Sequence, residues 1–335
     1  MFERLLDLNN LYEAFRECSR GVSWKASVQR YEYYLLPNIC KLRQSLIDGT
    51  YQQRPFYEFD IVERGKHRHI RSVHISDRVL QKALCDQILV PELEKFLIHD
   101  NGASRVGKGV DFARRRLEKF LHEHYRKHST EGYVLKIDIS KYFDSIPHDK
   151  FVDKLAMVIK DEKVINLIRY LVSTFPGDCG LGLGAQLSQI GGIFYMNDVD
   201  IYCKVVRSIK HYIRYMDDII IIHHDKDLLR DVLSGILKIL QELGLKANMK
   251  KTFIMPLKHG FTFLKIRYRL TDTGHLVMIP HKSTFLRETR KIKKLSASIL
   301  FEQFKSWHNN LLRFHCRRRL FYMRKKLAEK FMQSD

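Results

Sequence analysis

The spacing of apolar residues divides the chain into helical and extended stretches. Within residues 1–50, Leu5 and Phe15 are among the apolar positions that recur near a helical period, which predicts amphipathic helices. The same periodicity predicts helices over residues 78–97, 112–128, 150–174, 189–206 and 228–243, and from residue 280 onward. We expect Asp111 to cap the helix that follows it.

Runs of alternating or continuous apolar residues predict the strands. Residues 132–139 alternate apolar and polar side chains, and residues 211–224 have the pattern of two strands joined by a tight turn. Residues 57–75 predict a hairpin whose tip, residues 63–69, is very basic. Further short strands are expected over residues 260–270 and 275–279. Because strands and helices are interspersed without strict βαβ alternation, the pattern indicates an α+β fold.

The composition is that of a folded protein. Of 335 residues, 45% are apolar and 11% are aromatic, whereas disordered chains are poor in both classes. The length suits about two domains or one multi-lobed catalytic core. No apolar run reaches the roughly 20 residues of a membrane-spanning helix, and the N-terminus is charged too early for a secretory signal. We therefore expect a cytoplasmic protein with no membrane partner.

The cysteines indicate a reducing compartment. They are far apart and include no C-x-x-C pair. Their positions are 18, 40, 85, 179, 203 and 316. This spacing argues against a zinc ribbon and against a disulfide scaffold, and favours reduced thiols.

The chain is strongly basic. Lysine and arginine number 59 against 38 acidic residues, a formal charge of +21. About half of the excess lies in residues 282–335, with 15 basic and 4 acidic side chains. Such a surface attracts polyanions, because bound cationic side chains release the counterions of phosphates. Nucleic acid is therefore the expected partner, and a solvated basic surface is the alternative.

Two segments place carboxylates beside apolar strands. Asp217 and Asp218 form a tight turn that four consecutive isoleucines follow, and Asp138 ends another predicted strand. Neighbouring buried carboxylates repel each other and lose hydration, and a divalent cation with a preference for oxygen ligands resolves both problems. Together the aspartates suit a two-metal site for nucleotidyl transfer. The alternatives are a surface turn for the pair and a helix cap for Asp138.

At this point the residues resemble a family. Tyr215-Met216-Asp217-Asp218, with Asp138 upstream and Phe143 five residues after it, is similar to the palm of a reverse transcriptase, and the resemblance covers nearly the whole chain. It implies a right-hand polymerase with fingers, a palm of a small antiparallel sheet plus helices, and a short helical thumb. The implied domains are 1–130 (N-terminal helices and fingers), 131–279 (palm, with 150–180 contributing to the fingers) and 280–335 (basic thumb).

The resemblance also implies roles at the centre of the palm. Asp138 and Asp217 would bridge two Mg²⁺ ions, with Mn²⁺ as an alternative. Asp218 would be the third carboxylate of this metal site, and Ile139 would also belong to it. Phe143 would be a steric gate against ribose, with core packing as the alternative. Lys251 would protonate the leaving pyrophosphate as a general acid, with a solvated charge as the alternative.

Further motifs extend the resemblance to the nucleotide and the primer. The implied nucleotide-binding residues are Lys66 and Arg68, with Arg71 as an alternative, together with Gly184 and Gln189 of the glycine-rich loop. The implied primer and template contacts are Tyr215, Met216, the primer-grip residues Phe263, Leu264 and Lys265, and the thumb residues Arg317, Arg318 and Arg319. The exposed-turn alternative stays open for each fingers cation.

These implications add up to a Mg²⁺-dependent RNA-directed DNA polymerase of a bacterial or phage retroelement. Ser188-Gln189 is similar to the reverse transcriptases of diversity-generating retroelements, whereas Gly182 and Lys265 depart from the commoner pattern and favour an anti-phage defence enzyme as the alternative. A non-catalytic RNA-binding scaffold is a further alternative. The expected partners are an RNA template, a DNA or RNA primer, dNTPs, a structured noncoding RNA and an accessory protein. No segment resembles an RNase H, endonuclease or integrase domain.

Overall fold

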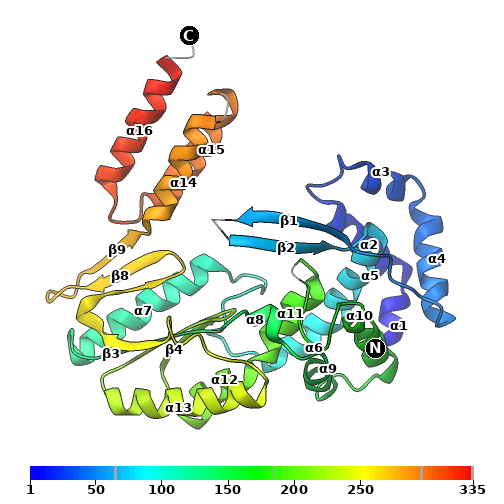
Figure 1. Ribbon diagram of the computed structural model, residues 1–335, viewed down its shortest axis with the longest axis horizontal. Coiled ribbons are helices and arrows are strands. Elements are labelled where there is room, and N and C mark those ends of the chain that lie inside the picture. The colour runs from blue at the N-terminus through cyan, green and yellow to red at the C-terminus, as the bar shows by residue number, and fades with distance from the viewer. Residues whose placement is uncertain (64–65, 183, 295–296, 333–335) are drawn as a thin grey trace.

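Within the residues that it describes, the computed structural model contains helices and three small antiparallel sheets (Figure 1). It describes residues 1–63, 66–182, 184–294 and 297–332, apart from the side chains of residues 63, 66, 68 and 297–299. The α+β class expected from the sequence is confirmed. No helix within the described ranges is long and apolar enough to cross a membrane.

A four-stranded antiparallel sheet lies at the centre, in the order β4-β5-β3-β6. Its strands are β3 (Tyr133–Asp138), β4 (His211–Tyr215), β5 (Asp218–His223) and β6 (Phe253–Pro256).

The central strand β5 is buried on both faces. Ile219 and Ile221 belong to the core beside α13 (Lys226–Glu242), and Ile220 and Ile222 belong to the core beside α7 (Val110–His128). These two helices cover opposite faces of the sheet (Figure 1). The predicted strand is therefore confirmed, since a strand covered on both faces needs apolar residues at every position.

The N-terminal third is mainly helical. Helices α1–α4 are followed by a two-stranded antiparallel hairpin, whose strands extend toward the side of the C-terminal helices (Figure 1). The elements are α1 (Phe2–Leu6), α2 (Leu8–Ser19), α3 (Ala26–Tyr33), α4 (Leu35–Ile47), β1 (Tyr57–Glu63), β2 (Lys66–Ser72) and α5 (Ile75–Leu84). The predicted tip at residues 63–69 is too long, because residues 66–69 belong to β2 and pair with β1.

Several predicted helices differ from the structure in their boundaries, and two of them show the reason most clearly. Residues 150–174 form two helices, α9 (His148–Ala156) and α10 (Glu162–Ser173), because Asp161 caps the second by accepting from the amides of Lys163 and Val164. The helix expected from residue 189 begins earlier, as α11 (Gln186–Tyr195), and continues into α12 (Asn197–Ile201) and a π-turn. The glycine-rich loop is correspondingly shorter than expected.

Asp111 does not cap α7. The residue before the helix is Gly109, which has no side chain that could cap it, and Asp111 lies inside the first turn. Its carboxylate instead accepts a hydrogen bond from Arg313, which precedes the last helix. Asp111 therefore ties α7 to the C-terminal helices.

The C-terminal part joins a small sheet to three helices. Residues 260–270 form two strands rather than one, because Leu264 and Lys265 adopt left-handed backbone angles, φ 45° and 65°, and turn the chain. The elements are β7 (Phe261–Phe263), β8 (Ile266–Leu270), β9 (Leu276–Pro280), α14 (Lys282–Lys294), α15 (Ala297–Leu311) and α16 (Arg317–Met332). Strand β6 was not expected from the sequence.

Candidate active site

The three central aspartates meet at one end of the sheet. Asp138, the last residue of β3, is the direct cross-strand partner of Asp218, the first residue of β5. Tyr215 pairs with Asp218 across a two-residue turn that contains Met216 and Asp217. Met216 has φ 55°, a left-handed conformation that side-chain-bearing residues rarely adopt. The sheet register thus brings a distant carboxylate beside the adjacent pair.

Asp218 is held in an unfavourable environment for its charge. The pKa of its carboxyl is raised to about 6, mainly by burial and to a smaller extent by the charges of Asp217 and Asp138, while Lys136 opposes the rise. Lys136 Nζ lies 3.2 Å from Oδ1 of Asp218, yet that buried oxygen accepts no well-formed hydrogen bond. The ionised form of this carboxylate is therefore disfavoured, and a cation bound beside it would stabilise that form.

Asp138 is positioned by the segment before β6. Its Oδ2 accepts from Lys251 Nζ at 3.0 Å and from Asn248 Nδ2 at 3.2 Å. Its backbone carbonyl accepts from the Asn248 amide at 2.7 Å. The Lys251 side chain nevertheless stays half exposed, at 52%. Asn248 is a contact that the sequence did not single out, and its only signal was its place in the short segment that precedes Lys251.

These residues fit a divalent cation in their chemistry. Three carboxylates converge, and carboxylate oxygens are the ligands that hard cations such as Mg²⁺ prefer. Among the described residues, no three acidic, histidine or cysteine side chains are already arranged around one point as a metal site. Instead, lysine ammonium groups lie against Asp218 and Asp138. Asp138, Asp217 and Asp218 are the residues that could hold a cation, and Ile139 follows directly on β3.

Phe143 lies beside this end of the sheet. It belongs to the short helix α8 (Tyr142–Ser145) and is half-buried against the core. Its ring is so close to α11 that a Cβ added to Gly192 would lie 3.0 Å from a ring carbon. Its carbonyl accepts from the Leu181 amide at 2.8 Å. Phe143 is therefore held against α11 and the glycine-rich loop.

Comparison with known proteins decides the family. Residues 58–268, well over half of the chain, match the family described as "Reverse transcriptase (RNA-dependent DNA polymerase)". The chain belongs to the reverse transcriptase family. Its members are nucleotidyltransferases that use divalent metal ions. The chain matches none of the curated proteins at a significant level.

Solved structures show the same fold in a wider group. Telomerase from Candida albicans, in complex with a TWJ fragment of telomeric RNA, matches with a TM-score of 0.54 and 12% identity, over 85% of this chain and 60% of that chain. Apo telomerase from Candida tropicalis matches with a TM-score of 0.53 and 18% identity, over 83% of this chain and 57% of that chain. This reverse transcriptase chain therefore spans about 60% of the length of the telomerase chain it matches first.

The basic positions predicted to bind the nucleotide fall on two faces of one hairpin. The ladder of β1 and β2 puts positions 66 and 68 on the face of Ile70, and Arg71 on the other face. Arg71 Nε donates to Glu58 Oε1 at 2.9 Å, so this arginine already has an acidic partner. The side chains of Lys66 and Arg68 lie outside the described part of the structure.

The glycine-rich loop presents a small open surface. Gly184 has φ 104°, and a Cβ there would meet no atom within 4 Å. Gln189 is exposed in the first turn of α11, whereas the preceding Ser188 is buried and its hydroxyl has no hydrogen-bond partner. Leu183 lies outside the described residues. The structure thus places Gln189 on the surface beside the loop, with Gly184 at an open position.

The predicted primer-grip residues divide into an anchor and a turn. Phe263 is fully buried, so its ring packs into the core. Leu264 and Lys265 form the left-handed turn, and the carbonyl of Leu264 accepts from Arg114 Nη2 at 2.7 Å. Tyr215 is half-buried at the end of β4. Phe263 can therefore hold the turn in place, while Leu264 and Lys265 form its outer part.

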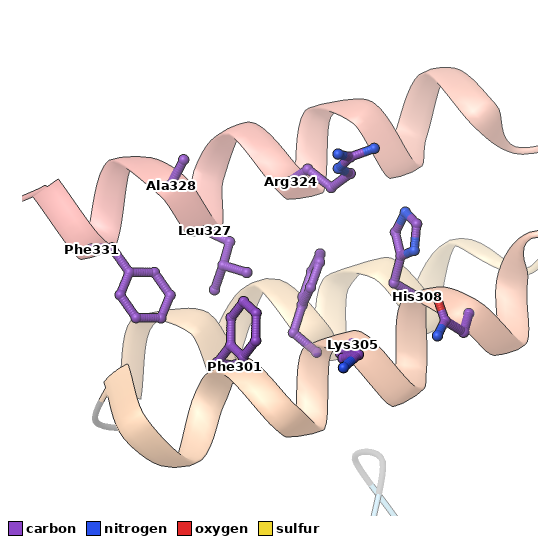
Figure 2. Close-up of a pocket in the computed structure, with 9 residues that line it drawn as sticks. Phe301, Lys305, His308, Arg324, Leu327, Ala328 and Phe331 are labelled. Carbon is purple, nitrogen blue, oxygen red and sulfur yellow. The ribbon is translucent and has the colours of Figure 1, made fainter.

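The C-terminal helices are rich in exposed cations. Arg317, Arg318 and Arg319 are all exposed in the first turn of α16. A separate groove of about 600 Å³ lies between α15 and α16, and no acidic residue is among those that line it. Figure 2 shows its aromatic and cationic side chains on the two helices, among them Phe301, Lys305, His308, Arg324 and Phe331. These surfaces are suited to an anionic partner.

Proposed function

We propose that this chain extends a DNA or RNA primer on an RNA template, using dNTPs and Mg²⁺. The observation that carries the proposal is the pairing of Asp138 with Asp218 across the sheet, which joins the two carboxylate-bearing segments of the chain at one point. A protein that only bound RNA would gain nothing from these carboxylates, because clustered buried charges of one sign are unfavourable.

In this mechanism the three aspartates would hold the cations, and Lys251 and Asn248 position Asp138 beside them. When bound, the cations would lower the pKa of the primer 3′-hydroxyl and neutralise the leaving pyrophosphate. Asp138 orients Lys251, whose ammonium lies 3.0 Å from Oδ2 of that carboxylate, and Asn248 holds the same oxygen. Lys251 is then placed to donate its Nζ proton to a pyrophosphate oxygen.

The incoming nucleotide would lie between Phe143 and the glycine-rich loop. Phe143 is packed against α11, so its ring cannot withdraw easily from a ribose 2′-hydroxyl. Gly184 leaves room for close approach of the nucleotide, and Gln189 is exposed to contact it. Positions 66 and 68 lie on one face of the β1–β2 hairpin and Arg71 lies on the other, so only one of these sets can face the triphosphate. We favour Lys66 and Arg68, because Arg71 is already paired with Glu58.

The template–primer duplex would lie against the C-terminal helices, which act as the thumb. The support is electrostatic. The arginines of α16 are exposed, and phosphate contacts of this kind supply most of the non-specific affinity for nucleic acid. We assign domains accordingly: residues 1–130 with 150–180 as fingers, the rest of 131–279 as palm, and 280–335 as thumb.

The proposal is tested with purified protein, Mg²⁺, dNTPs and a DNA primer on an RNA template. Extension is expected from the wild type and is lost in the double variant Asp217→Ala/Asp218→Ala, while RNA binding persists. The matched control is Asp153→Ala, which removes an exposed aspartate of α9 and leaves extension unchanged. If the double variant extends the primer as well as the wild type, the assigned site is wrong. If neither extends it but both bind RNA, the scaffold alternative holds.

For the biological role, we propose a bacterial or phage retroelement of the diversity-generating type. The support is the pair Ser188-Gln189, which is similar to the enzymes of that type, together with the exposure of Gln189 beside the glycine-rich loop. Anti-phage defence is the second candidate, supported by Gly182 and Lys265. A structured noncoding RNA and an accessory protein are the proposed partners. Sequencing of nucleic acid that copurifies from native cells separates the roles: error-rich cDNA of one RNA favours the first, and cDNA made only during phage infection favours the second.

A further inference from the structure

Arg214 lies wholly inside the protein, close to the turn that carries the aspartates. It belongs to β4, and its side chain has no exposed surface. Its guanidinium contacts Asp200 of α12 through two bonds, Nε to Oδ1 at 2.7 Å and Nη2 to Oδ2 at 2.6 Å. A buried charge is unfavourable unless every donor has a partner. The partners of the remaining N–H donors, on Nη1 and Nη2, therefore indicate the role of Arg214.

Those donors reach two backbone carbonyls. Nη1 donates to the carbonyl of Met216 at 3.1 Å, and Nη2 donates to the carbonyl of Ile193 at 2.8 Å. Met216 is the turn residue with φ 55°, a conformation that persists only where surrounding contacts hold it. Ile193 lies on α11, the helix that carries Gln189. The Arg214 side chain thus connects the turn that carries Asp217 and Asp218 to α11, the helix that follows the glycine-rich loop.

Asp200 anchors this arrangement from the other side. It is completely buried, and its carboxylate also accepts from the Tyr212 hydroxyl at 2.5 Å and from Asn101 Nδ2 at 3.4 Å. Tyr212 and Arg214 are two residues apart on one strand, so both side chains face α12. The guanidinium is therefore fixed by several elements that do not belong to the turn.

We propose that Arg214 is a positioning residue that holds the Met216 peptide, and with it Asp217 and Asp218, opposite Asp138. Its effect on rate rests on the proposed polymerase function, whereas its effect on the turn does not. An apolar residue could fill the same volume, but it would give the Met216 carbonyl no donor. Misplacement of reacting groups by about 1 Å can reduce a rate about 100-fold.

The first test is Arg214→Lys. The lysine keeps the positive charge and can pair with Asp200, but a single ammonium cannot reproduce the planar fork that reaches Asp200, Ile193 and Met216 together. In single-nucleotide addition, kcat is expected to fall about 10- to 100-fold. The KM for dNTP and the affinity for template–primer are expected to change far less.

The second test separates positioning from stability. The triple variant Arg214→Met/Asp200→Leu/Tyr212→Phe replaces the whole buried polar group by apolar side chains of similar size, a change that often preserves or raises stability. If Arg214 only stabilises the fold, this variant recovers both the melting temperature and kcat. If Arg214 positions the turn, the melting temperature recovers and kcat stays low.

The matched control is Tyr195→Phe. The Tyr195 hydroxyl is also buried and donates to the carbonyl of Leu243, so the variant removes a buried hydrogen bond that does not involve the turn. Its kcat is expected to stay at the wild-type value at temperatures where the protein is folded. A fall in kcat equal to that of Arg214→Lys would assign the effect to stability and overturn the proposal.

Amide hydrogen exchange supplies a readout that needs no activity. Peptides that span residues 213–219 are expected to exchange faster in Arg214→Lys than in the wild type or in Tyr195→Phe, with little change elsewhere in the sheet. Unchanged exchange there, kcat near the wild-type value, or failure of both Arg214 variants to fold would each overturn the proposal. An inactive wild type would instead contradict the polymerase function, and the exchange data would still decide the role of Arg214.

Discussion

Asp138 and Asp218 are direct cross-strand partners, although 80 positions separate them in the sequence. The pairing places one carboxylate from β3 beside two from the β4–β5 turn. Side chains of directly opposed residues in an antiparallel pair lie about 5 Å apart at Cβ. The site therefore depends on the register of β3 against β5, because a slip of one residue would turn Asp138 to the other face.

The contact between Lys251 and Asp138 predicts a catalytic defect without a stability defect. In Lys251→Met, the rate of nucleotide addition is expected to fall about 10²- to 10⁴-fold, the range for removal of a general acid. Because the Lys251 side chain is 52% exposed, the free energy of unfolding should change by less than about 1 kcal/mol. Single-turnover kinetics and urea denaturation measure the two effects.

The control for this prediction is the adjacent, exposed Lys250. Lys250→Met removes the same charge without the contact to Asp138 and should keep the wild-type rate. Equal reductions in both variants would show that general positive charge, and not proton donation by Lys251, supports the reaction.

The packing of Phe143 against α11 predicts a change in sugar selection. Phe143→Ala should reduce the preference for dNTP over rNTP, measured as a ratio of kcat/KM values, by about 10- to 200-fold, as expected when a pocket wall of this size is removed. Phe151→Leu is the matched control, because Phe151 is buried in the core beside Gly191, and we expect this variant to lose stability without a change in sugar selection. Selection that is unchanged in Phe143→Ala would leave core packing as the role of this ring.

His211 predicts a decrease of stability in acid. Burial lowers the pKa of its imidazole to about 4, against the opposing effect of Glu123. The unfolded chain, with a histidine pKa of about 6.5, therefore binds a proton between pH values of about 6.5 and 4 that the folded protein does not. Over this window the free energy of unfolding falls as the pH falls, by about 1–3 kcal/mol from this residue.

Urea denaturation between pH values of about 7.5 and 4.5 measures this effect against the variant His211→Gln, which does not titrate at this position. The wild type should become less stable relative to the variant as the pH falls below about 6.5. Parallel pH profiles for the two proteins would show that His211 is protonated equally in the folded and unfolded states.

The exposed arginines of α16 predict a change in salt dependence. In Arg317→Gln/Arg318→Gln/Arg319→Gln, the slope of log affinity for template–primer against log salt should decrease by up to about 0.9 for each phosphate that the protein no longer neutralises. The matched control removes three cations near or on α10: Lys160→Gln/Lys163→Gln/Arg169→Gln. Fluorescence anisotropy at several salt concentrations compares them, and equal slopes in both variants would contradict a specific role of α16.

Much of the local structure follows from neighbouring residues. The run Ile219–Ile222 indicated a strand covered on both faces, and Tyr215–Asp218 indicated a tight turn, because such patterns involve residues that are close in sequence. Boundaries were less predictable. Asp161 splits a continuous apolar pattern into α9 and α10, since a capping side chain outweighs periodicity.

Other features needed the tertiary structure. Asn248 contacts Asp138, the hairpin register separates Arg71 from positions 66 and 68, and Arg214 meets Asp200. Each of these relationships depends on backbone pairing or packing between segments that the sequence leaves apart. The sequence by itself therefore determined which carboxylates and cations are available and that the strands around them are buried. Only the folded chain decided which of them meet, because strand register and burial set the distances on which charge–charge interactions depend.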